Sequence, residues 1–176
     1  MANHGVIIQT KYTAENVDAY NLVGIYKEGD MDNGVLVTLK SMNKDENGFI
    51  EGYEYEVEPA KADSLSVCVV KTPAVGTNLE MIQYADPRAF YNEKGRPMSL
   101  ARLMAGIDYI EVDANCFVGG TAPTAAQNFV GIGANGKLAP ANSAPATGCY
   151  FTVEGKHRVA VGQEVMTTYV LLCARN

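Results

Sequence analysis

Several features that would indicate a specific chemistry are scarce or missing in this sequence. It has no tryptophan and two histidines, and its four cysteines, Cys68, Cys116, Cys149 and Cys173, form no Cys-x-x-Cys pair. The spacing that zinc sites require is therefore absent. Because each cysteine stands among apolar or β-prone neighbours, we predict four small, buried hydrophobic side chains that stay reduced.

Clusters of positive charge and long apolar runs are missing as well. The 176 residues include 14 Lys and Arg against 20 Asp and Glu, which gives a net charge of −6. Proteins that bind nucleic acid need clustered basic residues with interleaved aromatics, so we expect no nucleic-acid partner. The apolar run at residues 169–174 is too short to cross a bilayer. The N-terminus lacks a basic start and a long apolar core, so we expect no signal peptide, no membrane partner and synthesis in a cytoplasm.

The sequence also offers little for nucleophilic catalysis. His157 lies in a charged segment, Gly-Lys-His-Arg, that is typical of a surface turn, and His4 is close to the N-terminus. No Gly-x-Ser-x-Gly elbow is present to activate a serine. These absences favour a protein that is not an enzyme.

Turn-forming pairs and short β-rich runs make up much of what is present. Asn33-Gly34 and Asn47-Gly48 are turn pairs, and they predict a hairpin between strands at residues 35–39 and 49–57. The nearly continuous apolar run at residues 65–70 predicts a buried, central strand.

The second half alternates loops and strands. Residues 119–148 are rich in Gly, Ala, Pro, Thr and Asn, which predicts a long loop. Short strands are expected within and after this loop, at residues 128–130, 137–139, 149–153, 158–161 and 165–173, with a turn at 154–156. The whole pattern predicts a mainly β fold: a small β-sandwich or barrel with one or two short helical turns and long loops. We expect residues 1–32 to form an extended N-terminal arm or lead-in, and residues 33–176 to form a single β-rich domain.

The stretch at residues 99–113 combines a predicted turn of helix with a strand and three acids. Ser99 can cap a helical turn that ends at Gly106, and the strand begins at Tyr109. Its alternation directs Ile110 and Val112 inward and leaves Glu111 and Asp113 on the opposite face, with Asp108 at the turn. Such acids suit a catalytic pair or a calcium site, but their spacing favours the solvated face of a strand. Glu54, Glu56 and Glu58 form a second acidic row of the same kind.

A dinucleotide-binding pattern also occurs, in the wrong context. Residues 131–136 match Gly-x-Gly-x-x-Gly, which needs a following helix to hold a pyrophosphate. Here Asn135-Gly136 is a hairpin-turn pair and Pro140 stops any helix. A glycine-rich hairpin is the better interpretation, and we expect no cofactor.

An order of short motifs runs through the chain. After an extended start comes Asp-Asn-Gly-Val-Leu-Val-Thr-Leu at residues 32–39, and an acidic β-region leads to Val-Cys-Val-Val at 67–70. Arg102 then precedes Gly-Ile-Asp-Tyr-Ile-Glu-Val at 106–112, and Asn-Gly-Lys-Leu follows late, at 135–138. In this order the chain resembles the decoration or cement proteins of tailed phages of Gram-positive hosts, small head-associated proteins encoded beside major capsid genes.

This resemblance implies a non-catalytic virion structural protein that binds the outer surface of a capsid and stabilises it. Its partner would be the major capsid protein, and the chain would be made in the host cytoplasm and bind the shell as a monomer or homo-trimer. The contacts would come from residues 1–32 and part of 119–148. The expected capsid-contact residues are Val6, Ile7, Ile8, Tyr12, Tyr20 and Tyr26.

Two alternatives stay open at this point. The chain is also compatible with a tail-tube or other ring-forming structural subunit. A metal-assisted hydrolase that uses Asp108, Glu111 and Asp113 is the less favoured alternative.

Overall fold

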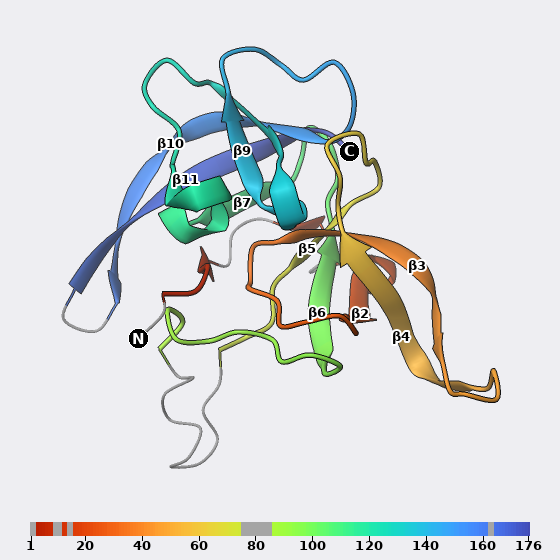
Figure 1. Ribbon diagram of the computed structural model, residues 1–176. Helices are drawn as coiled ribbons and strands as arrows, with labels where there is room; N and C mark the ends of the chain where they lie inside the picture. The colour runs from red at the N-terminus through yellow and green to blue at the C-terminus, as the bar shows by residue number, and fades with distance from the viewer. Residues whose placement is uncertain (1–2, 9–11, 14–15, 75–85, 162–163) are drawn as a thin grey trace.

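Two β-sheets, one of them closed into a barrel, form the body of the protein (Figure 1). The computed structural model describes residues 3–8, 12–13, 16–74, 86–161 and 164–176. Strands account for 47% of the chain and helical turns for 8%, which confirms the mainly β prediction. Within the described residues, no helix is long and apolar enough to span a membrane.

The strands follow one another closely along the chain. They are β1 (Ile7–Ile8), β2 (Asn21–Ile25), β3 (Leu36–Lys44), β4 (Ile50–Pro59), β5 (Cys68–Val70), β6 (Pro97–Arg102), β7 (Tyr109–Val112), β8 (Phe129–Ile132), β9 (Leu138–Ala141), β10 (Tyr150–Val161) and β11 (Glu164–Arg175). Single turns of 3-10 helix connect some of them: η2 (Asp18–Tyr20), η4 (Ala114–Cys116), η5 (Val118–Gly120) and η6 (Ala134–Gly136). The described residues thus contain more helical turns than the one or two expected.

The barrel has the strand order β2-β4-β3-β5-β6 and closes through antiparallel pairing of β6 with β2. β2 runs parallel to β4, whereas the other neighbours in the barrel are antiparallel. Alternate residues of the strands point inward, and a small core of Val37, Val57, Val70 and Leu100 fills the space. Each such buried side chain contributes about 1.5–3 kcal/mol to folding.

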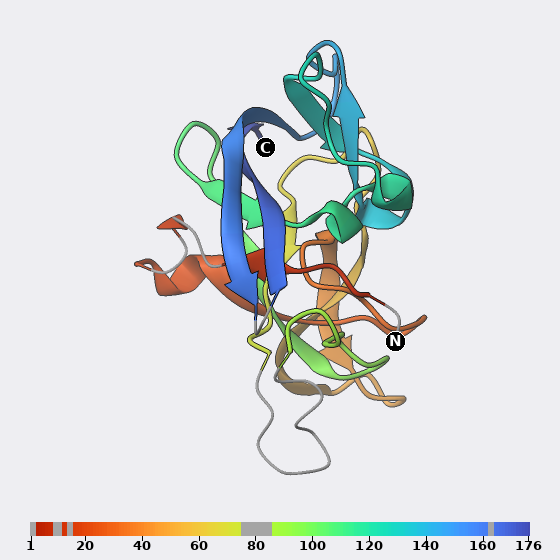
Figure 2. The same ribbon diagram turned by 90° about the vertical axis from the view of Figure 1, so that its left-hand side faces the viewer.

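The second sheet is open and has the order β1-β7-β11-β10-β8-β9. Its inner face packs on the outside of the barrel, because Leu36 and Val69 of the barrel share one core with Ile110, Phe151 and Leu171 of the sheet. β10 and β11 form a long hairpin that crosses this sheet and runs past it (Figure 2). The core between the two sheets makes the molecule a single packed body.

Several predicted elements are present as expected. β3 and β4 form the predicted hairpin around Asn47-Gly48. β5 is fully buried and pairs with both β3 and β6, which confirms its central position. The glycine-rich pattern at residues 131–136 lies between the antiparallel strands β8 and β9, and Asn135 and Gly136 both have positive φ, at 55° and 69°. This confirms the hairpin interpretation.

Two local predictions were wrong. Residues 97–102 form strand β6 instead of a helical turn capped by Ser99, since pairing with β2 and β5 satisfies their backbone on both sides. The expected turn at residues 154–156 is absent, because β10 runs through it with a register shift between Val153 and Gly155. A bulge there takes up the extra residue without ending the strand.

The N-terminal region also differs from the expected arm. β1 pairs with β7 in the open sheet, and β2 is a strand of the barrel. Residues within 1–32 therefore belong to both sheets, and the described structure has no boundary between an arm and a domain at residue 32.

Candidate functional site

The three acids of residues 108–113 are buried, so the prediction that Glu111 and Asp113 face solvent was wrong. Asp108 is 0% exposed, Glu111 5% and Asp113 4%. A buried carboxylate is tolerated only where hydrogen bonds or charges compensate for its lost hydration. The partners of each acid therefore show what it does.

Asp108 and Asp113 hold the N-terminal segment against the body. One carboxylate oxygen of Asp108 accepts hydrogen bonds from the backbone N–H and the hydroxyl of Thr13, the latter at 2.6 Å, and the other accepts from Met104 N–H at 2.7 Å. Asp113 accepts from Val6 N–H at 2.9 Å, and its own N–H donates to the carbonyl of Val6 at 3.0 Å. These bonds fix both ends of the segment from Val6 to Thr13.

Glu111 has a different set of partners. Its Oε1 accepts a hydrogen bond from the hydroxyl of Thr168 on β11 and lies 3.2 Å from Nδ1 of His157 on β10. The His157 side chain is 65% exposed, so this pair lies at the surface of the sheet. Among the described residues, no group of three His, Cys, Asp or Glu side chains is arranged to hold a metal ion.

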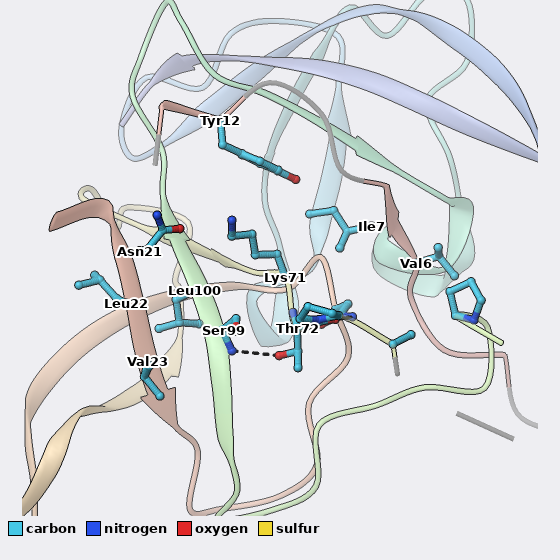
Figure 3. A pocket seen from close by; sticks show the side chains of 14 residues that line it. Val6, Ile7, Tyr12, Asn21, Leu22, Val23, Lys71, Thr72, Ser99 and Leu100 are labelled. Carbon is cyan, nitrogen blue, oxygen red and sulfur yellow. Dashed lines mark hydrogen bonds between the residues drawn. The ribbon is translucent and has the colours of Figure 1, made fainter. Parts of the chain in front are cut away.

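A cleft lies between the N-terminal segment and the rim of the barrel (Figure 3). It has a volume of about 390 Å³. One wall comes from the N-terminal segment, one from β2 and β6, and one from the loops beside β5. The lining residues are Val6, Ile7, Tyr12, Asn21, Leu22, Val23, Asn33, Lys71, Thr72, Pro73, Ala74, Pro87, Ser99 and Leu100.

Fixed hydrogen bonds shape the floor of this cleft. The hydroxyl of Thr72 accepts from Ser99 N–H at 3.0 Å, and the side-chain amide of Asn33 exchanges hydrogen bonds with the backbone of Thr72 at 2.8 and 3.0 Å. The ammonium of Lys71 lies over the ring of Tyr12, 5.1 Å from its centroid, in a cation–π contact. Mostly apolar walls with a few fixed polar groups are typical of binding sites.

Three of the six expected capsid-contact residues line this cleft, and the other three lie outside its lining. Val6, Ile7 and Tyr12 line the cleft together. Val6 is only 1% exposed and Tyr12 2%, so both pack mainly into the protein's own core, which corrects their assignment as open contact residues. Ile8 and Tyr20 are half-buried. Tyr26 is half-buried too, and it lines a second cavity of about 330 Å³.

Among the residues that the structure describes, the most exposed apolar cluster lies elsewhere, at the end of the β3–β4 hairpin. Phe49 is 71% exposed, Ile50 55% and Tyr53 89%. The end of the hairpin runs away from the barrel (Figure 1), and these three side chains are exposed there. Sequence reasoning missed this surface. The available signal was Phe49, an aromatic residue directly after the charged turn at residues 45–48. A hairpin end that is buried would carry no such charge.

An ion pair connects the loop before β6 with the β10–β11 hairpin. Arg88 contacts Asp86 at 2.8 Å and also contacts Glu164 at the start of β11. Hydrogen bonds from Arg88 lower the pKa of Asp86, and the same bonds raise the pKa of Arg88. Residues 87–89 form a simple turn, in which Asp86 accepts a hydrogen bond from Arg88 N–H at 2.9 Å.

The four cysteines match the sequence prediction in their burial. All four are buried and none is in a disulfide. Burial raises the pKa of Cys68 to about 11 and also raises that of Cys116, which lies beside the carboxylate of Asp113. A thiol that stays protonated is a poor nucleophile, so Cys68 and Cys116 act as packing groups.

No protein-family model, curated protein or solved structure matches this chain.

Proposed function

We propose that this chain is a non-catalytic virion structural protein that binds the outer surface of a tailed-phage capsid and stabilises the shell. The major capsid protein is its partner. The order of short motifs from residue 32 to residue 138 supports this proposal, and the observation that carries it is the exposed apolar end of the β3–β4 hairpin, Phe49, Ile50 and Tyr53.

These three side chains have the properties of an interface centre. Large aromatic residues contribute most of the binding energy in many interfaces, and truncating one costs about 2 kcal/mol or more. Left in water, such a cluster is unfavourable, and covering it on an assembled shell recovers about 25 cal/mol for each Å² of apolar surface. A shell repeats the same contact at many symmetric sites, so a ligand of the assembled lattice stabilises that lattice.

The charge of the chain suits an outer position. Its net charge of −6 would be repelled by packaged DNA, whereas the shell separates an external protein from the genome. The long core between the two sheets provides a rigid body behind the hairpin. On this proposal the hairpin end makes the contact and the N-terminal segment stays folded on the body.

Co-sedimentation with shells assembled from the major capsid protein tests the proposal. We expect the triple variant with Phe49→Ser, Ile50→Thr and Tyr53→Ser, the hairpin variant, to bind at least tenfold more weakly than the wild-type chain. The matched control is Leu65→Ser, Ile107→Thr, Val165→Thr, which removes three exposed apolar side chains outside the hairpin and should bind normally. If the unchanged chain does not sediment with shells, the function is wrong. If the hairpin variant binds as well as the control, the contact surface is wrong.

A ring-forming subunit, such as a tail-tube protein, is the second candidate. In the described residues, the outer half of the β10–β11 hairpin (156–161 and 164–168) pairs only within itself and leaves two open edges. Open edges allow strands of neighbouring subunits to pair. Electron microscopy of the purified chain separates the candidates, because a ring-forming subunit gives hexameric rings or tubes and a decoration protein stays monomeric or trimeric.

A further inference from the structure

We infer that the cleft between β1 and the barrel binds an extended peptide segment that carries a carboxylate side chain next to apolar residues. The inference depends on the proposed function in one respect: the segment in the virion would come from the capsid subunit. The chemistry of the cleft itself can be tested separately. Three features of the described residues support it.

The first feature is an unpaired positive charge. Among the described residues that line the cleft, Lys71 is the one charged side chain. In the described part of the chain it has no carboxylate within ion-pair distance, although acids outnumber bases in the sequence by 20 to 14. Its contact with the Tyr12 ring leaves the ammonium N–H donors without an anion. An anionic group entering the cleft would complete this site.

The second feature is the open edge of β1. This strand is the first of its sheet, and among the described residues it pairs with β7 alone. Val6 C=O accepts from Asp113 N–H, and Val6 N–H donates to the Asp113 side chain. Because Val6 faces β7 in this way, the N–H and C=O of Ile7 point away from β7 in the alternating antiparallel pattern. Ile7 also lines the cleft. An added strand could pair there, as peptides do in β-augmentation.

The third feature is the match of size and polarity. Val6, Leu22, Val23 and Leu100 give the cleft apolar walls, and Asn21 and Ser99 add polar groups. The volume of about 390 Å³ lies at the small end for ligand pockets. It suits about three residues of extended chain, which span about 10 Å. A short segment with apolar side chains on both sides of an acid fits these walls and Lys71 together.

NMR titration of the full chain with two capped tripeptides tests the inference. The probes are acetyl-Val-Glu-Val-amide and acetyl-Val-Gln-Val-amide, which differ by one charge. We expect the Glu peptide to shift the amide signals of Ile7, Leu22 and Ser99 and to bind at least fivefold more tightly than the Gln peptide. Absence of shifts in the cleft, or equal affinity for the two peptides, would overturn the inference.

Two lysine variants provide a matched comparison. Lys156 lies over the ring of Tyr169 at 5.1 Å, the same cation–π distance as Lys71 over Tyr12, but on β10 and outside the cleft. Lys71→Met should abolish the preference for the Glu peptide, and Lys156→Met should keep it. If both variants lose the preference equally, the overall charge of the protein explains the preference, and the assignment of the binding site to the cleft is wrong.

The same variants, tested on shells, keep this inference distinct from the proposed function. If the unchanged chain binds shells, Lys71→Met should weaken binding at least fivefold and reduce its dependence on salt, while Lys156→Met should not. Equal binding of all three to shells contradicts the inference that the capsid supplies the segment and leaves the proposed function intact. Peptide binding in the cleft without any binding to shells supports the peptide site and contradicts the proposed function.

Discussion

The acids at residues 108–113 and the acids of β4 follow similar patterns in the sequence but lie in different surroundings. Glu111 and Asp113 are two residues apart, as are Glu54, Glu56 and Glu58. The first set is buried, with Asp108, and each member has hydrogen-bond partners from distant parts of the chain. The β4 set is partly exposed, and Glu58 pairs with Lys40 at 3.4 Å across the hairpin.

This difference shows that alternation along a strand determines which face an acid is on, but not whether that face is covered. The face of β7 that carries Glu111 is covered by β10 and β11 residues, and the N-terminal segment covers Asp108 and Asp113. The β4 acids are half-buried on a barrel strand, where Glu56 lies opposite Ile25 of β2 and Glu58 lies opposite Thr38 of β3. The buried acids are therefore structural anchors that connect distant parts of the chain.

The largest effect is expected for Asp108→Ala. This change leaves Thr13 and Met104 N–H groups without their acceptor, and bonds to a charged acceptor are worth about 1.5–3 kcal/mol each. We expect the free energy of unfolding to fall by about 3 kcal/mol or more. Urea denaturation measures it, with Glu56→Ala as the control. A loss below about 1 kcal/mol would contradict the anchor role. If the Ala variant does not fold, Asp108→Asn gives the smaller loss that can be measured.

A smaller, more local effect is expected for Asp113→Asn. The amide can still accept one hydrogen bond, but it loses the charge that binds Val6 N–H, so we expect a loss of about 1–2 kcal/mol. Hydrogen exchange should speed up at least tenfold at Val6 and stay unchanged in β3 and β4. Equal changes in both regions would mean that Asp113 supports global stability and does not specifically hold the N-terminal segment.

For Glu111 the two possible replacements should differ. Glu111→Gln keeps an acceptor for the Thr168 hydroxyl and should cost less than about 1 kcal/mol, whereas Glu111→Ala leaves this buried hydroxyl unpaired and should cost about 2 kcal/mol. Thermal unfolding of both variants measures the difference. The same loss for both would show that the bond to Thr168 is not what Glu111 contributes.

Asp86 extends the comparison to an exposed acid with a cationic partner. Arg88 lowers the pKa of Asp86, so the pair stabilises the fold above the unfolded pKa and this stabilisation is lost as the pH falls through the folded pKa. Both side chains are partly exposed, so the effect is small. The stability difference between the unchanged chain and Asp86→Asn should shrink from about pH 6 to about pH 2. A difference that does not depend on pH would exclude the ion pair as its source.

The smallest effect is expected when all three β4 acids are replaced. The triple variant with Glu54→Gln, Glu56→Gln and Glu58→Gln loses a row of partly exposed charges and one surface ion pair. Each such substitution should change the free energy of unfolding by no more than about 0.5 kcal/mol. Calorimetry should therefore show a melting temperature within a few degrees of the unchanged chain. A drop as large as that of Asp108→Ala would remove the distinction between the two rows.

Local sequence signals predicted the elements whose strands are neighbours in the sequence. The Asn-Gly pairs located the β3–β4 and β8–β9 hairpins, because such turns need residues that tolerate positive φ. Local signals did not predict the structure where the same residues fit both a helix and a strand. The spacing of Leu100, Leu103 and Met104 fits one face of a helix, whereas Met98 and Leu100 alternate as in a strand. The segment forms strand β6 because it pairs with β2 on one side and β5 on the other.

The sites depended on contacts that no local pattern contains. Thr13 lies 95 residues from Asp108 along the chain, and Val6 lies 107 residues from Asp113. These contacts form only in the tertiary fold. The sequence pattern alone therefore predicted that the acids would be exposed to solvent. The cleft at Lys71 has the same origin, since its walls come from the N-terminal segment, β2, β6 and the loops beside β5.

The most direct test of the functional proposal is electron cryo-microscopy of capsid shells saturated with this chain. We predict added density on the outer surface, with the end of the β3–β4 hairpin, Phe49, Ile50 and Tyr53, at the contact with the shell. Shells without added density would contradict the function. Density in which this hairpin points into solvent would contradict the contact surface on which the proposal depends.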